Sequence, residues 1–353
     1  LDNFPCFLTT AHSDADLDRI VEAYRDAAAE MIASGFFPVR AREQADAGDG
    51  VRRVPTTEPQ REVWLADRLG TEASLAYNES VTLHLRGRLD AERLRAAVGA
   101  LPQRHDALRS TFSDDGLWLQ VPDTVAPLDV PLLDLSQAAD PDAELAAITT
   151  RHVSQPFDLA KGPLLRAELL RLGDGHHALV LSGHHIVLDG WSFWVLVKEL
   201  AAACRDDAPL QAPPSFADYA RMRAAQPAGS AGDLAWWATL FEDGGPALDL
   251  PTDRPRPAVR TQRAGRIDLM LPAGLVTQVR KLGASQGASL FATLIAGFSA
   301  LLHRLSGQED VVIGVPAAGQ AAAGLEGLVG HCVHMLPLRL RPSGALAFDT
   351  LVD

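Results

Sequence analysis

The sequence predicts a mixed α/β (α+β) protein in two lobes. Strand-like alternation in residues 80–86 and the apolar run 178–183 are interleaved with helical periodicity, as in residues 91–101. Hydrophobic residues make up 47% of the 353-residue chain, which is enough to bury a sizeable core. A stretch rich in glycine, alanine and serine, residues 226–232, is the expected hinge between the lobes.

A helix and a linker are expected before the first lobe. Ser13 can cap a helix with two aspartates in its first turn, and Gly35 ends that helix. Its apolar face consists of Leu17, Ile20, Val21 and Tyr24. Residues 39–53, rich in charge, glycine and alanine, are the predicted linker.

The first lobe is expected to span residues 54–225. Its residues 80–86 predict a strand with alternating valine and leucine, and residues 178–183 predict a short buried strand. A turn at Asp189 and Gly190 follows, and Ser192 opens an amphipathic helix. The apolar face of this helix consists of Trp194, Leu196, Val197, Leu200 and Ala201.

The second lobe is expected to span residues 226–353. Residues 250–263 contain three prolines and predict a long exposed connection. A strand is expected at 264–271, a helix at 291–302 and a buried strand at 311–316.

Composition and charge exclude several classes of function. The net charge of −13 argues against a nucleic-acid partner. The three cysteines, Cys6, Cys204 and Cys332, are scattered, and no secretory signal is apparent, which is typical of a reducing compartment. No apolar run is long enough to span a bilayer without interruption. We therefore expect a cytoplasmic protein without a nucleic-acid or membrane partner.

Two adjacent histidines followed by an acid are the most informative feature of the chain. His184 and His185 end the apolar run, Asp189 comes four residues after the second histidine, and Gly190 follows directly. Side chains on a strand alternate between faces, so the two imidazoles should point in opposite directions. One can then face a cavity while the other packs inside. A histidine at a strand end near a carboxylate is a candidate acid–base group.

Three interpretations of this segment are open from these residues alone. The histidines can be a packed core pair at a strand–turn–helix junction. A metal site is the second, since His176 and His177 lie just upstream, but adjacent strand residues do not converge on one ion and the cysteines show no ligand spacing. We therefore expect no metal. The third interpretation is acyl transfer with one histidine as base.

Four further motifs occur in one order around the double-histidine segment. They are residues 57–65, 104–112, 215–220 and 329–339. Together with the histidines, this ordered set resembles the condensation domains of nonribosomal peptide synthetases, from about Val54 to the last residue. Five motifs in the same order are far more specific than any one of them.

The resemblance implies a fold and a reaction. Condensation domains have two lobes related to chloramphenicol acetyltransferase, set in a V with a central tunnel. A donor acyl group arrives as a thioester on the 4'-phosphopantetheine arm of one carrier protein, and an acceptor amine arrives on another. No cofactor is expected to bind the chain itself. The amine attacks the thioester at the double-histidine segment, which requires loss of a proton and stabilisation of an oxyanion.

The resemblance also implies roles for single residues. His185 matches the second histidine of the family motif and is the expected catalytic residue, as a base or by orienting the amine, with His184 supporting it. Asp189 is expected to be structural, in a buried salt bridge with Arg104, or with Arg109 as the second candidate. The neighbouring glycine, at position 190, is expected to leave room for a substrate arm and to allow a tight turn.

Four other residues are candidates for the tunnel or the motifs. Trp191 either lines the tunnel or packs in the core, and Ser192 caps the helix. Gly330 and His334 belong to the last motif, where the family usually has asparagine at the position of His334 and phenylalanine at that of Cys332. The chain is also shorter than a complete condensation domain. We therefore expect the second lobe to be incomplete and the activity of this chain to be in doubt.

A second resemblance covers residues 1–38. Residues 7–18 and the helix after them are similar to the tail of a glutamate-semialdehyde-type aminotransferase, and a plain amphipathic helix is the alternative. The resemblance implies a larger synthase with neighbouring aminotransferase and adenylation domains. It also implies a donor that carries an amine, such as a β-amino acyl group.

Other functions stay open beside condensation. A non-catalytic condensation-like domain that recruits partners would keep the fold, but intact His185 and Asp189 argue against it. An epimerisation domain shares the histidines, but the segments of Arg104 and Gly330 resemble condensation more closely. A freestanding acyltransferase that uses coenzyme A has the same chemistry, and the aminotransferase-like residues argue against it. A heterocyclising relative would have aspartate at His184.

Overall fold

The computed structural model describes residues 49–352, apart from 206–210, 227–230, 256–260, 263 and 266. These residues belong to one compact unit of the chain, Gly48–Asp353. The predicted N-terminal helix, Cys6, most of the predicted linker and the centre of the predicted hinge lie outside the described residues.

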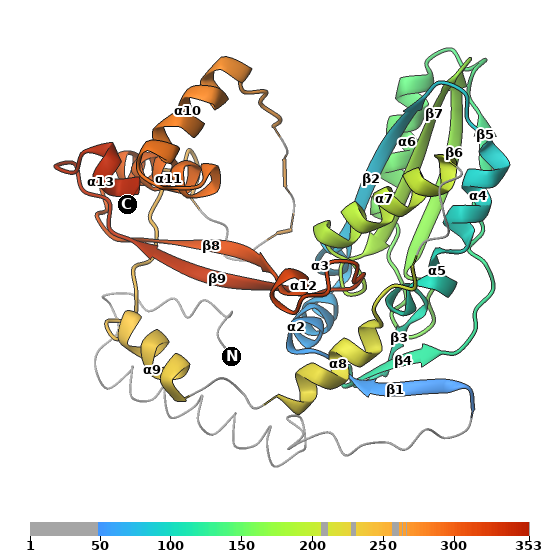
Figure 1. Cartoon of the computed structure of the whole chain (residues 1–353), viewed down its shortest axis with the longest axis horizontal. Coiled ribbons are helices and arrows are strands. Elements are labelled where there is room, and N and C mark those ends of the chain that lie inside the picture. Colours follow the sequence, from blue (N-terminus) through green and yellow to red (C-terminus); the bar gives the residue numbers. More distant parts are fainter. Residues whose placement is uncertain are drawn as a thin grey trace. The chain divides into compact units, whose positions relative to one another are not determined.

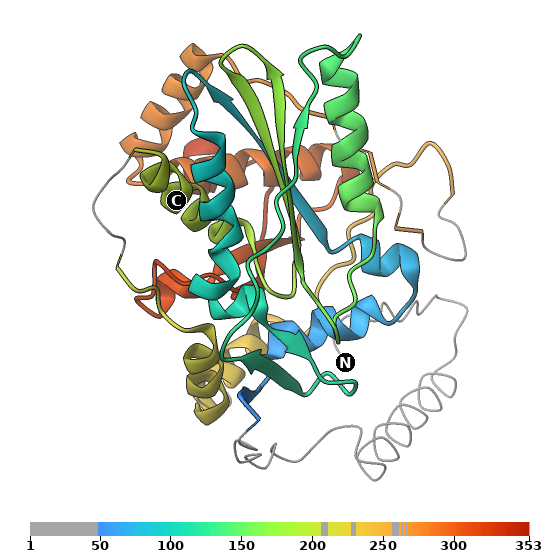
Figure 2. The same cartoon turned by 90° about the vertical axis from the view of Figure 1, so that its right-hand side faces the viewer.

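A four-stranded sheet of order β2-β7-β6-β5 forms the centre of the first lobe (Figure 2). Strands β2 (Asn78–Arg86) and β6 (Leu165–Gly173) pair antiparallel with β7 (His176–His184), and β5 (Leu132–Asp134) pairs parallel with β6. The strands predicted at 80–86 and 178–183 are confirmed. The last residue of β7, His184, lies opposite the first residue of β2.

Helices cover both faces of this sheet, so β7 is buried on both sides. One face packs against α4 (Ala91–Gly99) and α7 (Gly190–Arg205), and the other packs against α6 (Pro141–Ser154). Side chains alternate between the two cores, as strand geometry requires. The residues of the first core include Leu169, Leu179 and Leu181, and those of the second include Leu170, Ala178 and Val180.

A smaller antiparallel sheet of order β1-β4-β3 lies in the same lobe. Its strands are β1 (Val51–Pro55), β3 (Thr111–Phe112) and β4 (Trp118–Pro122). Residues 51–53 were predicted as linker and instead begin β1, because their backbone pairs with β4. The charged residues of this segment are typical of a linker, so the sequence did not predict this short strand.

The N-terminal residues of helix α2 (Glu58–Asp67) contact the segment that follows β7. Thr57 and Gln60 form a capping box, in which each side chain accepts a hydrogen bond from the other residue's backbone N–H. The side-chain amide of Gln60 also donates to the carbonyl of Ile186, the second residue after β7. Helix α3 (Thr71–Leu75) then leads into β2.

The predicted helix at 91–101 is divided into two. Helix α4 ends at Gly99, and a short helix α5 (Leu101–Arg104) begins beside Pro102. Proline lacks an N–H and is favoured at the start of a helix, which accounts for the break. A 3₁₀ helix, η1 (Asp106–Arg109), follows.

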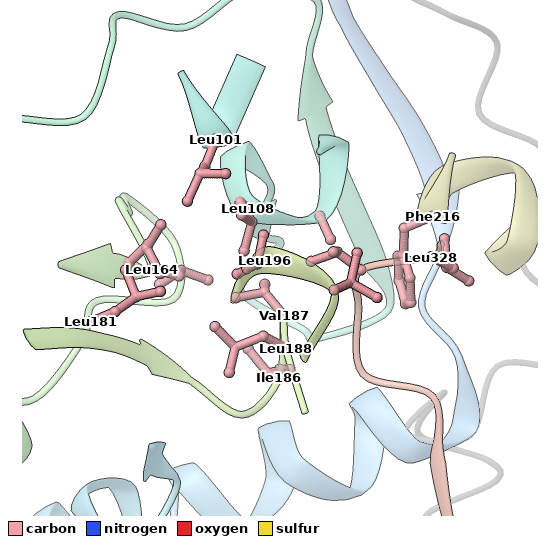
Figure 3. Packing of buried hydrophobic residues seen from close by; sticks show 14 of the residues in the cluster. Leu101, Leu108, Leu164, Leu181, Ile186, Val187, Leu188, Leu196, Phe216 and Leu328 are labelled. Atoms are coloured by element: carbon pink, nitrogen blue, oxygen red, sulfur yellow. The ribbon is translucent and has the colours of Figure 1, made fainter. Parts of the chain in front are cut away.

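Residues 186–188 join β7 to α7 and are fully buried. Figure 3 shows Ile186, Val187 and Leu188 packed beside Leu196 of α7. Helix α7 begins two residues earlier than predicted, and Trp194, placed on its apolar face from the pattern, is exposed. Helix α8 (Phe216–Ala225) comes next along the chain and ends just before the predicted hinge.

The C-terminal part contains a two-stranded antiparallel sheet and several helices (Figure 1). The strands are β8 (Val311–Ala318) and β9 (Val333–Leu340). The helices are α9 (Ala231–Leu240), α10 (Ala273–Ser285), α11 (Leu290–Ser306), α12 (Gly319–Ala322) and α13 (Phe348–Val352). The helix predicted at 291–302 and the strand predicted at 311–316 are confirmed.

The strand predicted at 264–271 is wrong. The described residues of this segment lie in no strand, and Ile267 and Met270 are 96% and 91% exposed. A strand needs a neighbour for its backbone hydrogen bonds, and alternation alone does not supply one.

Among the described residues, no single helix is both long and apolar enough to cross a membrane. Helices α10 and α11 meet such a criterion only as a pair, bent by 100°.

Candidate active site

His184 and His185 diverge as the strand alternation predicts. The side chain of His184 is 0% exposed, and that of His185 is 24% exposed. His184 Nδ1 accepts a hydrogen bond from the Ile186 N–H, and its Nε2 lies 3.4 Å from Asp67 Oδ1, a long contact. His184 therefore belongs to the packed interior, and His185 is the histidine with access to other molecules.

The ring of His185 is held through Nδ1. This atom lies 3.0 Å from the carbonyl oxygen of Leu188 and 3.0 Å from Oε1 of Glu79. A carbonyl oxygen accepts hydrogen bonds only, so Nδ1 carries the proton. In the neutral ring the lone pair is then on Nε2. The backbone is fixed as well, since the His185 N–H donates to the Tyr77 carbonyl at 2.8 Å.

Two opposing effects set the protonation of His185. Burial opposes the charged form of the ring. The hydrogen bond and negative charge of Glu79 favour that form, with smaller contributions from the Leu188 carbonyl and Asp189, and on balance the pKa of His185 is raised. An imidazole with a raised pKa is a stronger base and holds a proton at Nε2 more readily.

A second imidazole, that of His331, lies against His185. The two ring centroids are 4.5 Å apart at an interplanar angle of 63°. Burial, together with the charges of His185 and His334, lowers the pKa of His331 to about 3. His331 is therefore neutral near pH 7. Its buried Nδ1 has no hydrogen-bond partner among the described residues.

Asp189 is fully buried and joins the start of α7 to the C-terminal part. Its Oδ1 accepts from the N–H and the hydroxyl of Ser192, both at 2.8 Å, and so caps α7. Its Oδ2 accepts from the side-chain amide of Gln320 at 2.9 Å and the Cys332 N–H at 3.2 Å. Four donors thus solvate this carboxylate without a cationic side chain.

The predicted salt bridge of Asp189 with Arg104 or Arg109 is wrong. Arg104 instead forms a bidentate pair with Glu199 of α7, at 2.8 and 2.9 Å. Arg109 donates to the backbone carbonyls of Pro102, Gln103 and Pro122. These partners hold the two guanidinium groups, and the four donors to Asp189 include neither arginine.

The residues next to Asp189 differ from expectation in detail. Ser192 does not cap α7; it lies inside the first turn, where Asp189 is the cap. Gly190 does not adopt a left-handed conformation, and an added Cβ would meet no atom within 4 Å, so this position borders open space. Trp191 is partly buried against the core, and its indole N–H donates to the Glu326 carbonyl.

Gly330 and His334, both in the last motif, have different neighbours. Gly330 is buried against Phe216, and its N–H donates to the hydroxyl of Ser192 at 3.0 Å. His334 lines a cavity of about 550 Å³ beside α8, together with Tyr219 and Arg223. The His334 pKa is lowered by burial and then by the charge of Arg223.

Sequence reasoning missed several residues that this site uses. Glu79 and His331 flank His185, Asp67 faces His184, Gln320 binds Asp189, and Glu199 binds Arg104. Only His331 had a signal, because it lies inside the motif at 329–339. The others come from distant segments, and their positions depend on strand register and helix packing.

Among the residues that the structure describes, no group of three or more His, Cys, Asp or Glu side chains is arranged to hold a metal ion. The described site consists of imidazole, carboxylate and backbone groups around an accessible histidine nitrogen. These groups can orient an amine, move a proton and donate to an oxyanion.

Comparisons with known proteins identify relatives of this chain. A family model described as "Condensation domain" matches residues 51–353. Chondramide synthase cmdD of Chondromyces crocatus is 38% identical over 311 residues, covering 85% of this chain and 8% of that protein. Phosphinothricin tripeptide synthetase PhsC of Streptomyces viridochromogenes is 38% identical over 336 residues, covering 91% of this chain and 30% of that protein. The chain thus spans less than a third of either curated relative.

Solved structures share the fold. The first condensation domain of the calcium-dependent antibiotic synthetase, in complex with a substrate analogue, is similar with a TM-score of 0.70 and 27% identity. The match covers 85% of this chain and 71% of that one. The condensation domain of the Monacolin K polyketide synthase MokA has a TM-score of 0.74 at 22% identity, over 85% of this chain and 70% of that one. The predicted mixed α/β fold, related to that of chloramphenicol acetyltransferase, is confirmed.

Proposed function

This chain belongs to the condensation-domain family, and from that premise we propose that it forms an amide bond at His185. The donor is an acyl thioester on the 4'-phosphopantetheine arm of one carrier protein, and the acceptor is an amine on a second carrier. Members of the family are acyltransferases of nonribosomal peptide synthetases, and this chain has their double-histidine motif.

The orientation of His185 carries the proposal. Its Nδ1 is bound to Leu188 O and Glu79, and its side chain stays partly exposed. The Nε2 lone pair is therefore available to the acceptor amine. At Gly190 an added Cβ would meet no atom within 4 Å, and we infer that a substrate arm passes there.

The reaction follows from this arrangement. The amine nitrogen attacks the thioester carbonyl, the new C–N bond forms, and the C–S bond breaks to release the carrier thiol. The proton lost from nitrogen passes to His185 Nε2 and then to the departing sulfur. The raised pKa of His185 favours the imidazolium that forms in between, and this imidazolium can donate to the oxyanion.

The supporting residues hold the backbone around His185 in position. His184, buried behind the strand end, holds the backbone of Ile186. Asp189 caps α7 and binds Gln320 and Cys332, so we infer that its role is structural and that it transfers no proton.

The neighbouring domains are part of the proposal. The named relatives are synthases and synthetases several times longer than this chain, which supports carrier and adenylation domains as partners. The resemblance of residues 7–38 supports an aminotransferase on the N-terminal side and a donor that carries an amine. The flanking reading frame decides this point: an aminotransferase upstream and an adenylation domain downstream are expected.

The test of function is His185→Ala in the full natural protein. Single-turnover amide formation between two loaded carriers should fall by roughly 10²–10⁴-fold, because proton transfer and orientation by this ring are lost. His184→Ala is the comparison variant and should act mainly through stability, measured by thermal melting. Near-normal amide formation by a folded His185→Ala protein would contradict the assignment.

A further inference from the structure

Glu79 is the acidic side chain in hydrogen-bond contact with the proposed catalytic histidine. It lies on β2, where strand pairing places it opposite Gly183, two residues before His185. Its Oε1 is 3.0 Å from His185 Nδ1. Both side chains are partly exposed, so the pair lies at the accessible end of the sheet.

We propose that Glu79 is a positioning residue that acts through His185, by holding its Nδ1–H and stabilising the imidazolium formed during transfer. This inference rests on the proposed function. Leu188 O already fixes the tautomer, since it accepts from the same N–H. The specific contribution of Glu79 is therefore its negative charge.

The other titratable groups around His185 stabilise its protonated form less than Glu79 does. Asp189 is buried among four donors and favours a charged His185 less than Glu79 does. His331 packs on the ring but is neutral near pH 7, because its pKa is about 3. His184 faces the interior on the other side of the strand. Removing the Glu79 charge therefore removes the main group that raises the pKa of His185.

The charge of Glu79 sets the direction in which the His185 pKa should change. A negative charge beside the ring stabilises the protonated form, so its loss lowers the His185 pKa. The acidic limb of the pH–rate profile, which reports deprotonation of the base, should then move to lower pH. The rate on the plateau should fall, because a weaker base takes the amine proton less readily.

The experiment uses Glu79→Gln, which keeps the size and one oxygen and removes the charge. In the full protein, NMR titration of the His185 ring should show a lower pKa than in the wild type. The plateau rate of amide formation should fall by about tenfold, a part of the ~10²–10⁴-fold that acid–base help supplies. Glu309→Gln is the matched control: it removes the same charge at an exposed position in the C-terminal part and should change neither quantity.

Two further variants separate the possible outcomes. Glu79→Asp retains the charge and should restore much of the His185 pKa, which a purely steric role would not do. In a His185→Ala background, Glu79→Gln should lower the rate no further, because its effect passes through the ring. An unchanged His185 titration in folded Glu79→Gln would overturn the proposal. Failure of the wild type to form amide would instead overturn the proposed function, and the NMR titration would still decide the coupling.

Discussion

At the scale of single residues, the buried carboxylate of Asp189 shows how an acid can stabilise the structure without a cationic partner. Each of its oxygens accepts two hydrogen bonds, from Ser192 on one side and from Gln320 and Cys332 on the other. Hydrogen bonds to a charged acceptor are stronger than those between neutral groups, and removing the acceptor leaves the donors buried and unpaired.

We expect Asp189→Ala to lower the free energy of unfolding by about 2–4 kcal/mol, through the lost helix cap and the stranded donors. Asp189→Asn should lower the free energy of unfolding by less, because its side-chain oxygen can still cap α7. Part of the loss remains, because its amide group faces the donors of Gln320 and Cys332. Urea unfolding measures both. Asp174→Ala, at a fully exposed side chain, is the control and should change stability by less than about 0.5 kcal/mol. A fully stable Asp189→Ala that failed only in turnover would indicate a proton carrier instead.

Which residues could be predicted from the sequence depended on how local the physical cause was. The opposite directions of His184 and His185 follow from strand alternation, which is a property of neighbouring residues. The contact of Glu79 with His185 depends on the register between β2 and β7, about a hundred residues apart. The wrong partner for Asp189 has the same origin, because the approach of Gln320 is a tertiary contact.

At the scale of elements, α7 is held at two points along its length. Asp189 caps its first turn, and Glu199, in its third turn, binds Arg104 and His105 beside α5. Burial alone would raise the pKa of Glu199, but hydrogen bonds from His105 and Arg104, and their charges, lower it to about 2. Arg104 and His105, the first residues of the motif at 104–112, therefore fix the direction of the helix that follows the histidines.

This ion pair predicts a dependence of stability on pH. A depressed carboxyl pKa stabilises the fold above the ordinary value near 4.5, and that contribution is lost as pH falls toward 2. Glu199→Gln should cost about 1–3 kcal/mol at pH 7, less than the ~3–5 kcal/mol of a fully buried pair because Arg104 is 25% exposed. The difference from wild type should shrink between pH 5 and pH 3.

Urea unfolding at several pH values measures this difference, with Glu144→Gln on the exposed side of α6 as the control. A difference that stays constant with pH would indicate lost packing and not a lost charge.

The elements themselves were predicted where an apolar period ran undisturbed. The buried strand β7 and helix α11 have such periods and were found close to their bounds. The break between α4 and α5 depends on one proline, and the short strand β1 is charged and was taken for linker. In both cases a single residue or a distant partner overrides the local pattern.

At the scale of the whole described unit, residues 319–332 connect the C-terminal part to the first lobe. Leu328, Val329 and Cys332 belong to the same hydrophobic core as α7, α8 and the four-stranded sheet, and Figure 3 shows Leu328 beside Phe216. The polar contacts of Asp189 and Ser192 with this segment lie in the same place. The two lobes were predicted from a composition break at 226–232. That break could not show a shared core, because the contact of Leu328 with Phe216 joins residues more than a hundred positions apart.

Gly330 tests this connection, because a side chain has no room there. A Cβ at Gly330 would lie 1.9 Å from Cδ2 of Phe216, a fully buried ring, so Gly330→Ala must push the segment away from α8. We expect a loss of about 1–3 kcal/mol in stability. Hydrogen exchange should become faster in residues 319–332 and in the first turn of α7, where Asp189 and Ser192 lose their partners, while β6 and β7 stay protected.

Gly327→Ala is the matched control three residues earlier, since its Cβ would make only an ordinary contact, 3.5 Å from Pro214. Equal exchange in the two variants would show that the segment does not depend on this close approach. Faster exchange confined to Gly330→Ala, with a parallel fall in amide formation, would show that residues 319–332 hold the start of α7 and residues 185–189 in the position that the proposed reaction needs.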